Sequence, residues 1–221
     1  MESHILLHTS AYEYLMNGLM SGLFQPGQFY SENKLVKEMG VSRTPIRSAL
    51  QQLKRNRLIE IIPNKGFTLY KMSSNKDLIE NYQIRAAIEG YALSQLLKDK
   101  TERSREKIRE LKEIHDRLAS CYEEPFDRPR FAAIDEEFHK SLVGYLENPS
   151  FNELLFCQIF RTYILLKIVK MPNRDKEALV EHTALINAIL KGDEKETHAA
   201  LMNHLDNIVN YLSRASPKLN F

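Results

Sequence analysis

The sequence predicts a mainly α-helical protein, in which an N-terminal winged helix-turn-helix is followed by an all-helical antiparallel bundle of about six helices. Three observations support this fold class. Glycine and proline are concentrated in the first third, apolar residues recur with a helical period after it, and the charge changes sign between the two parts. Residues 1–72 hold 9 Lys/Arg and 5 Asp/Glu, whereas residues 73–221 hold 22 and 24. This division indicates two domains with different partners, at residues 1–72 and 75–215.

The composition is that of a globular protein, with 43% hydrophobic and 27% charged residues, and it excludes a disordered or low-complexity chain. Two distant cysteines, Cys121 and Cys157, predict neither a disulfide framework nor a cysteine metal site, which fits a reducing compartment. The N-terminus lacks the pattern of a signal peptide, and no segment approaches the roughly 18 apolar residues that span a bilayer. We therefore expect a soluble, cytoplasmic protein with no membrane partner.

The first third begins with two predicted helices. Apolar residues at helical spacing predict a helix over residues 11–23, and a Gln-Pro-Gly sequence predicts a turn after it. Ser31 is expected to cap a second helix over residues 32–39. Gly40 is expected to end that helix, because the residue after a helix often needs a positive φ.

The third helix is predicted over residues 42–56, with Ser42 as its N-cap and Pro45 in its first turn, where a missing N–H costs nothing. Two β-rich runs, at residues 58–62 and 67–70, flank a Pro-Asn-Lys-Gly turn and predict a hairpin. Helix, helix, turn, helix and hairpin is the order of a winged helix-turn-helix. The third helix is expected to face the core with Ile46, Ala49, Leu50 and Leu53.

The opposite side of the third helix carries Arg43, Thr44 and Arg47 near its N-terminus. In helix-turn-helix proteins that end enters the major groove, and arginine suits bidentate contact with guanine. Lys65 and Gly66, at the hairpin tip, can approach the DNA backbone or the minor groove. Such a basic helix is often only a solvated face, but the order of the elements, the basic tip and the positive local charge favour DNA binding. The expected DNA contacts are Ser42, Arg43, Thr44, Arg47, Lys65 and Gly66.

Helix-forming residues dominate the remainder of the chain, after a short linker near residues 72–74. Short connections between successive helices imply an antiparallel bundle. The predicted helices are residues 75–98, 101–124, 127–147, 151–171, 174–192 and 194–214. The expected core includes Leu142, Leu146, Leu154, Leu155, Ile159, Ile186, Ile189 and Leu190.

The bundle also contains a candidate metal site. Asp135 and His139 are four residues apart on one predicted helix and therefore share a face, while His182 and His204 lie on the last two helices. One carboxylate and three imidazoles suit Zn²⁺ or another divalent transition metal. The alternative for each residue alone is an ordinary polar side chain, and His4, His8, His115 and His198 are interpreted in that way.

The segment from Leu19 to Thr68 resembles the GntR-type bacterial transcription regulators. The matching pieces are GLMSGLFQPGQFYSENKLVKEMGVSRTPIRSALQQL and IPNKGFTL. The resemblance implies a dimer that binds a short palindromic operator, with Arg43, Thr44 and Arg47 on the recognition helix and Lys65 with Gly66 at the wing. Two residues depart from the family pattern. Asn33 stands where many members have a basic residue, and Arg57 stands where glycine is usual, so either Arg57 or Asn56 must take a left-handed conformation.

Residues from about 75 to 214 resemble the all-helical ligand-binding domain of the FadR branch of this family, the FCD type. The matching pieces are IRAAIEG, DEEFHKSLVGYLENPSF and EHTALINAILKGDEKETHAALMNHL. In metal-binding members the equivalents of Asp135, His139, His182 and His204 hold the metal, and all four are present here. This implies a metal inside the bundle, with zinc the first expectation and nickel or manganese as alternatives. It also implies a nearby cavity for a small effector, commonly an organic or sugar acid.

Arg85 lies in the first bundle helix, where the family often has an arginine that faces the pocket. A cation there suits an anionic effector, although a surface ion pair with Glu89 at i+4 is an equal alternative.

The sequence therefore predicts a non-enzymatic, ligand-responsive transcription regulator, with repression as the expected output. Its expected partners are a double-stranded DNA operator, a small organic or sugar acid and a second copy of the chain. Three alternatives to a metal-dependent effector pocket stay open. In the first, the metal is purely structural, and in the second, the pocket is metal-free and takes a larger ligand such as an acyl-CoA. In the third, the protein is an enzyme whose metal site activates a water.

Overall fold

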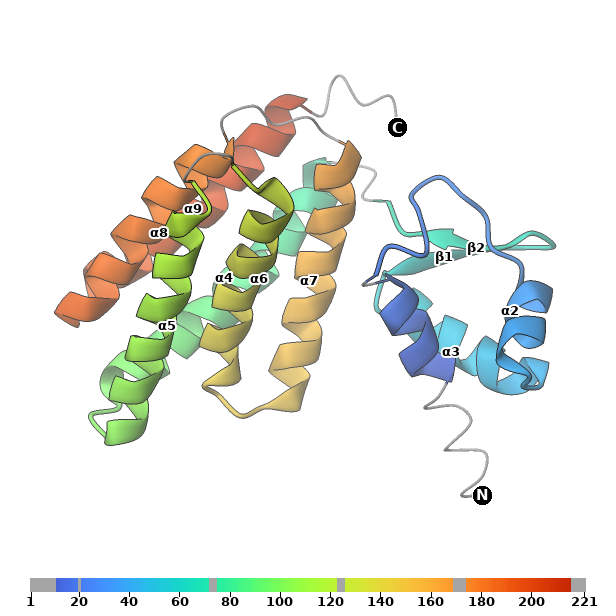
Figure 1. Cartoon of the computed structure of the whole chain (residues 1–221), viewed down its shortest axis with the longest axis horizontal. Helices are drawn as coiled ribbons and strands as arrows, with labels where there is room; N and C mark the ends of the chain where they lie inside the picture. Colours follow the sequence, from blue (N-terminus) through green and yellow to red (C-terminus); the bar gives the residue numbers. More distant parts are fainter. Residues whose placement is uncertain (1–10, 20, 72–74, 123–125, 169–173, 216–221) are drawn as a thin grey trace. The chain divides into compact units, whose positions relative to one another are not determined.

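The computed structural model describes residues 11–19, 21–71, 75–122, 126–168 and 174–215, with the side chains of residues 75, 163–168 and 215 left out (Figure 1). The predicted linker at residues 72–74 lies outside the described residues. The chain divides into two compact units, one formed mainly by residues 1–72 and the other by most of residues 73–221. The described part is mainly helical, with one two-stranded sheet, as predicted. None of the described helices is long and apolar enough to cross a membrane.

The first unit is a winged helix-turn-helix. A helix at residues 11–19 is followed by α2 (Glu32–Met39), α3 (Arg43–Arg55), β1 (Ile59–Ile62) and β2 (Gly66–Leu69). The strands form an antiparallel hairpin in which Ile59 is opposite Leu69. Tyr30 extends the sheet through a pair of backbone hydrogen bonds with Phe67, of 2.8 and 2.9 Å. The core of this unit contains Leu15, Leu19, Leu35, Ile46, Ala49, Leu50, Leu53, Leu58 and Phe67.

Local capping explains where the short helices begin and end. Ser31 accepts a hydrogen bond from the Asn33 N–H at 3.2 Å, and Gly40 ends α2 with a φ of 65°, both as predicted. Ser42 occupies the N-cap position of α3, but its side chain makes no capping hydrogen bond, so this part of the prediction is wrong. The described part of the first helix covers residues 11–19, and the chain turns back at Gly22 with a φ of 74°, so the helix does not reach residue 23 as predicted.

Arg57 adopts the left-handed conformation that follows α3. Its φ is 52°, whereas Asn56 has a φ of −76°. The Arg57 N–H donates to the Lys54 carbonyl at 3.0 Å, and the next N–H, of Leu58, donates to the Leu53 carbonyl at the same distance. These two hydrogen bonds close the C-terminus of the helix, and Arg57 occupies the left-handed position where glycine is usual. The structure thus resolves the alternative that the sequence left open.

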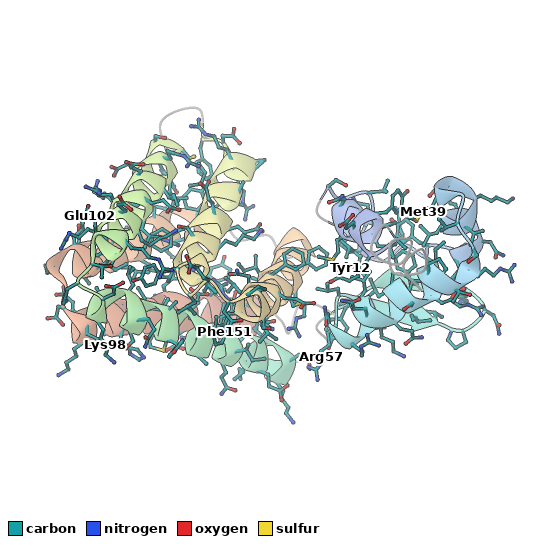
Figure 2. All side chains as sticks on the ribbon, turned by 90° about the horizontal axis from the view of Figure 1, so that it is seen from below. Tyr12, Met39, Arg57, Lys98, Glu102 and Phe151 are labelled. Atoms are coloured by element: carbon teal, nitrogen blue, oxygen red, sulfur yellow. The ribbon has the colours of Figure 1, made fainter. Side chains whose placement is uncertain are left out.

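The second unit consists, in its described part, of the six predicted helices. Five of them form a closed ring of neighbours, because α4 packs against α6 and α9, α5 against α6 and α8, and α8 against α9 (Figure 1). Side chains fill the space between the helices (Figure 2). The helices are α4 (Asn75–Lys98), α5 (Glu102–Ser120), α6 (Arg128–Gly144), α7 (Pro149–Ile168), α8 (Arg174–Lys191) and α9 (Glu194–Ala215).

The core of this unit differs from the prediction at three leucines. Leu154 and Leu190 are 47% and 50% exposed, and Leu146 is half-buried. Each of the exposed pair is adjacent to a buried apolar residue, Leu155 or Ile189. Successive residues of an α-helix point about 100° apart, so only one of two neighbours can face the centre of the core. Both cysteines are free and buried.

Replacing Arg57 with glycine is expected to raise the free energy of unfolding by about 1 kcal/mol, because glycine adopts a positive φ without the steric cost of a Cβ. Urea-induced unfolding of the two proteins measures the difference. Lys54→Gly, in the last turn of α3, is the control and should instead lower the free energy of unfolding by about 1 kcal/mol. An Arg57→Gly variant less stable than the wild type would contradict this account.

Candidate DNA-binding surface and metal centre

The N-terminal end of α3 presents the predicted recognition residues to solvent. Ser42, Arg43, Thr44 and Arg47 are all exposed, while the opposite side of the helix is buried as predicted. A groove of about 280 Å³ runs between the starts of α2 and α3 and the hairpin. Its lining includes Ser31, Asn33, Arg43, Arg47, Lys65 and Gly66. The structure therefore gathers the predicted helix and wing contacts around one surface of the first unit.

Arg47 is held in place on this surface. Its Nε donates to Glu32 Oε2 at 2.9 Å, although its side chain remains 63% exposed. Lys65 lies with its ammonium 5.3 Å from the centre of the Phe29 ring. Gly66 has a structural reason to be glycine, because a Cβ there would lie 2.1 Å from the Tyr30 carbonyl oxygen. The close approach of the hairpin to Tyr30 thus requires Gly66 whether or not DNA is bound.

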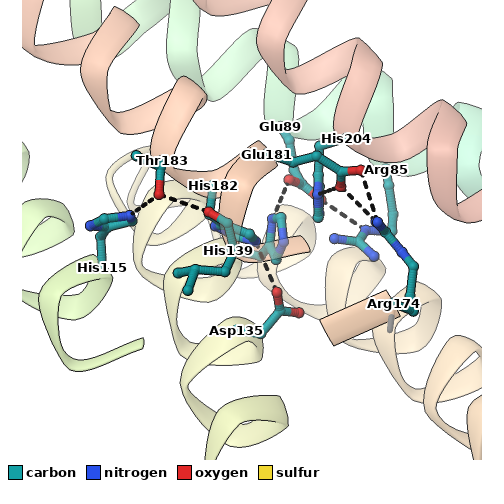
Figure 3. Close-up of polar contacts among 11 residues, drawn as sticks. Arg85, Glu89, His115, Asp135, His139, Arg174, Glu181, His182, Thr183 and His204 are labelled. Atoms are coloured by element: carbon teal, nitrogen blue, oxygen red, sulfur yellow. Dashed lines mark hydrogen bonds and ion pairs between the residues drawn. The ribbon is translucent and has the colours of Figure 1, made fainter. Parts of the chain in front are cut away.

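The four predicted metal ligands converge inside the bundle (Figure 3). Asp135 and His139 come from successive turns of α6, His182 from α8 and His204 from α9. One ligand atom from each lies within 4.8 Å of those from the other three. The three imidazoles are buried, and only Asp135 is partly exposed. This is the donor set and the spacing that one divalent transition-metal ion requires.

The nitrogen atoms at the centre have no other use in the described structure. The Nε2 atoms of His139, His182 and His204 are buried and lack a hydrogen-bond partner among the described residues. His182 Nε2 lies 2.8 Å from Asp135 Oδ1, but the two groups are not aligned as a hydrogen bond. Buried polar atoms without partners cost free energy, and a cation would satisfy all of these together. The residues present therefore fit a metal ion.

The electrostatics of the centre also suit a cation. Burial, together with the nearby His182 and His139, lowers the pKa of His204 to about 3 and keeps the ring neutral with a lone pair to donate. Burial alone would raise the pKa of Asp135, but contact with His182 lowers it below its ordinary value. A neutral imidazole and an ionised carboxylate are the forms that bind metals.

Two glutamates that were not predicted to belong to the metal centre contact its histidines. Glu89 of α4 lies beside His139, and Glu181 of α8 lies beside His204 (Figure 3). Burial would raise the pKa of each carboxylate, but the neighbouring histidine and an arginine lower both to about 2. Glu181 directly precedes the candidate ligand His182. This position in the sequence does not indicate that the Glu181 side chain contacts α9 and not the ion site.

Arg85 makes the ion pair that was the alternative to effector binding. Its Nε donates to Glu89 Oε1 at 2.9 Å, and both side chains are buried rather than on the surface. Its Nη2 atom is buried with no hydrogen-bond partner among the described residues. A separate small opening of about 80 Å³ adjoins the centre, with Asp135, His204, Arg174 and Arg128 in its lining.

The other histidines behave as the ordinary polar groups that were expected, where they are described. His115 Nε2 lies 3.0 Å from the Thr183 hydroxyl, and His198 is exposed on α9. His4 and His8 lie outside the described residues.

Comparison with known families agrees with both units. The model of the FCD domain matches residues 80–207, and the model of bacterial regulatory proteins of the gntR family matches residues 7–69. The chain belongs to the GntR family and carries an FCD domain. This GntR-family regulator is thus a DNA-binding transcriptional regulator and not an enzyme, so the catalytic alternative is set aside.

Individual relatives of the GntR-family regulator support the same assignment. An HTH-type transcriptional regulator of Agrobacterium vitis is 31% identical over 62% of this chain and 78% of its own length. The gluconate operon transcriptional repressor of Bacillus subtilis is 26% identical over 90% of this chain and 81% of its own. The structure of Escherichia coli McbR/YncC shares the fold, with a TM-score of 0.73 at 20% identity, over 94% of this chain and 97% of that one.

Truncating Arg47 is expected to weaken binding of the GntR-family regulator to its operator by about 1–3 kcal/mol, because it removes the guanidinium that we expect to contact a base. The operator can be selected from a random DNA pool with the wild-type protein, and the affinity measured by fluorescence anisotropy. Arg47→Lys should retain much of the salt-dependent affinity but lose sequence preference, because lysine lacks the planar fork of arginine. Lys54→Ala, at the other end of α3, is the control. Unchanged affinity and sequence preference in Arg47→Ala would exclude this role.

Proposed function

We propose that this protein is a dimeric, ligand-responsive transcriptional repressor that binds a palindromic operator and senses a small organic or sugar acid through a metal centre. Each first unit reads one half-site with Arg43, Thr44 and Arg47, while Ser42, Lys65 and Gly66 complete the DNA surface. The observation that carries the sensing role is the convergence of four ligand atoms, with three imidazole Nε2 atoms that have no hydrogen-bond partner among the described residues. A regulator that only bound DNA would not need this polar interior.

Asp135, His139, His182 and His204 would hold the ion. Zinc suits this set best, because three imidazoles and one carboxylate are ordinary zinc ligands, and nickel or manganese are alternatives. The metal supplies a Lewis-acid site to which a carboxylate can bind. The opening beside Asp135 and His204 gives a small anion access to the centre, and Arg174 adds positive charge to its wall.

An organic acid is favoured over a larger effector. The opening of about 80 Å³ suits a small molecule, and buried imidazoles with unpartnered nitrogens would be a costly lining for an acyl chain. Arg85 contributes a second cationic group, whose Nη2 has no hydrogen-bond partner among the described residues and suits a carboxylate. The relative from Bacillus subtilis that controls a gluconate operon supports a sugar acid as the first class to test.

Regulation follows from linkage between the two ligands. An effector that weakens operator binding must itself bind more weakly to the DNA-bound protein. A dimer on its operator blocks access to the promoter, so effector binding would relieve repression.

The purified protein is expected to contain about one transition-metal ion per chain, and a His182→Ala/His204→Ala variant to contain none, because half of the ligands are lost. Elemental analysis, with circular dichroism to confirm folding, measures both. His198→Ala removes an exposed histidine from the same helix as His204 and should retain the metal. Wild-type protein that stays metal-free after incubation with zinc, nickel and manganese would refute the metal centre.

Gluconate and related sugar acids are expected to weaken operator binding by the metal-loaded protein, with a smaller effect on His182→Ala/His204→Ala. Anisotropy with labelled operator, titrated with each acid, measures the change. If metal removal lowers the melting temperature but no acid changes operator affinity, the metal is structural. If acyl-CoA, and not a small acid, releases the metal-free protein from DNA, the larger-ligand alternative holds.

A further inference from the structure

Two of the three imidazoles at the candidate metal centre contact a glutamate through the ring nitrogen that faces away from the ion site (Figure 3). His139 Nδ1 lies 2.6 Å from Glu89 Oε2, and His204 Nδ1 lies 2.8 Å from Glu181 Oε2. In both rings the contact uses Nδ1 and leaves Nε2 as the atom that points to the ion site. Since an ionised carboxylate only accepts hydrogen bonds, each ring must donate from Nδ1.

Each glutamate is held in turn by an arginine. Arg85 donates from Nε to Glu89 at 2.9 Å, within α4. Arg174 donates from both Nη atoms to Glu181 at 2.8 and 2.6 Å, and Asn207 of α9 adds a third hydrogen bond at 2.8 Å. The result is two chains of the same order, arginine to glutamate to histidine, that end at the same centre.

This arrangement is difficult to explain by stability alone. Removing a carboxylate and a guanidinium from water is costly, and a buried ion pair often does no better than apolar residues of the same volume. Both pairs are nevertheless buried, and both end on a predicted metal ligand. His182 differs, because its Nδ1 has no partner among the described residues and its Nε2 lies beside Asp135.

We propose that Glu89 and Glu181 are positioning residues for the metal. They fix His139 and His204 in the tautomer and ring orientation that aim Nε2 at the ion, and Arg85 and Arg174 hold the two carboxylates in place. A hydrogen-bonded carboxylate behind a metal-binding imidazole also strengthens its donation to the ion. The inference rests on the proposed metal centre.

Metal binding by Glu181 variants tests the proposal. The affinity for Zn²⁺, measured by competition with a chromophoric chelator, should be 10–100-fold weaker in Glu181→Gln than in the wild type. The visible absorption spectrum of the Co²⁺-loaded protein should also change, because the His204 ring is no longer held in one orientation. Glu89→Gln should act in the same direction through His139. Glu196→Gln removes an exposed carboxylate that pairs with Lys191 and should change neither quantity.

A second variant guards against misfolding, because Glu181→Gln removes the closer carboxylate partner of the buried Arg174 and leaves it only the longer ion pair with Glu177 at 3.6 Å among the described residues. Arg174→Gln/Glu181→Gln removes both charges and should show the same loss of affinity and the same spectral change. Glu181→Asp, which keeps the charge, should recover part of the affinity.

The outcomes distinguish failure of the metal centre from failure of the positioning role alone. Wild-type protein that binds no metal would overturn the metal centre and this inference together. Wild-type protein that binds metal, with folded Glu181 and Glu89 variants of the same affinity and Co²⁺ spectrum, would overturn only the positioning role.

Discussion

The second unit depends on how its helices accommodate charged and polar side chains in a closed interior. Around the candidate metal centre, three imidazoles, two glutamates and two arginines are buried, from α4, α6, α8 and α9. Every such group loses water on folding and must find a partner. Most find one another, but the Nε2 atoms of three histidines converge without a hydrogen-bond partner in the part of the chain that the structure describes. The helices therefore cannot slide or rotate independently, since any shift would break contacts that water cannot replace. If a cation completes the set, its binding free energy becomes part of the folding free energy.

The first unit is built on the opposite plan. Its interior is apolar, with Phe24, Tyr30 and Phe67 in mutual ring contact, and its cations are on the outside. DNA presents a regular array of phosphates to a convex helix and a hairpin, so the arginines must stay hydrated and accessible until it binds. A small acid offers only one or two charges and has to be enclosed to be distinguished from others. With the small acid that we propose as the effector, the two units would place the same kinds of residue in opposite positions because their ligands differ in size.

The elements of the fold that were predicted correctly are those that depend on residues close together in the sequence. All six bundle helices, α2, and the hairpin follow from periodicity and capping, which depend on residues within one or two turns. The errors lie where three-dimensional packing decides. Leu154 and Leu190 each stand beside another apolar residue, and periodicity does not say which neighbour turns inward. Arg57 took the left-handed conformation over Asn56 through hydrogen bonds to α3 that composition does not encode.

At the candidate metal centre too, short-range spacing predicts part of the arrangement and three-dimensional packing decides the rest. Asp135 and His139 share a face by spacing alone. His182 and His204 joined them as a candidate set by residue type, but only the family resemblance gave a reason to expect that all four meet. The role of Glu181 was not predictable, because its partner His204 is on another helix. Successive residues on α8 point about 100° apart, so His182 faces the ion site while Glu181 contacts α9. A rotation of α8 would disturb both contacts at once. Arg174, which holds Glu181, also lines the opening beside the centre. An anion that bound there would therefore act on His182 and His204 through a single helix.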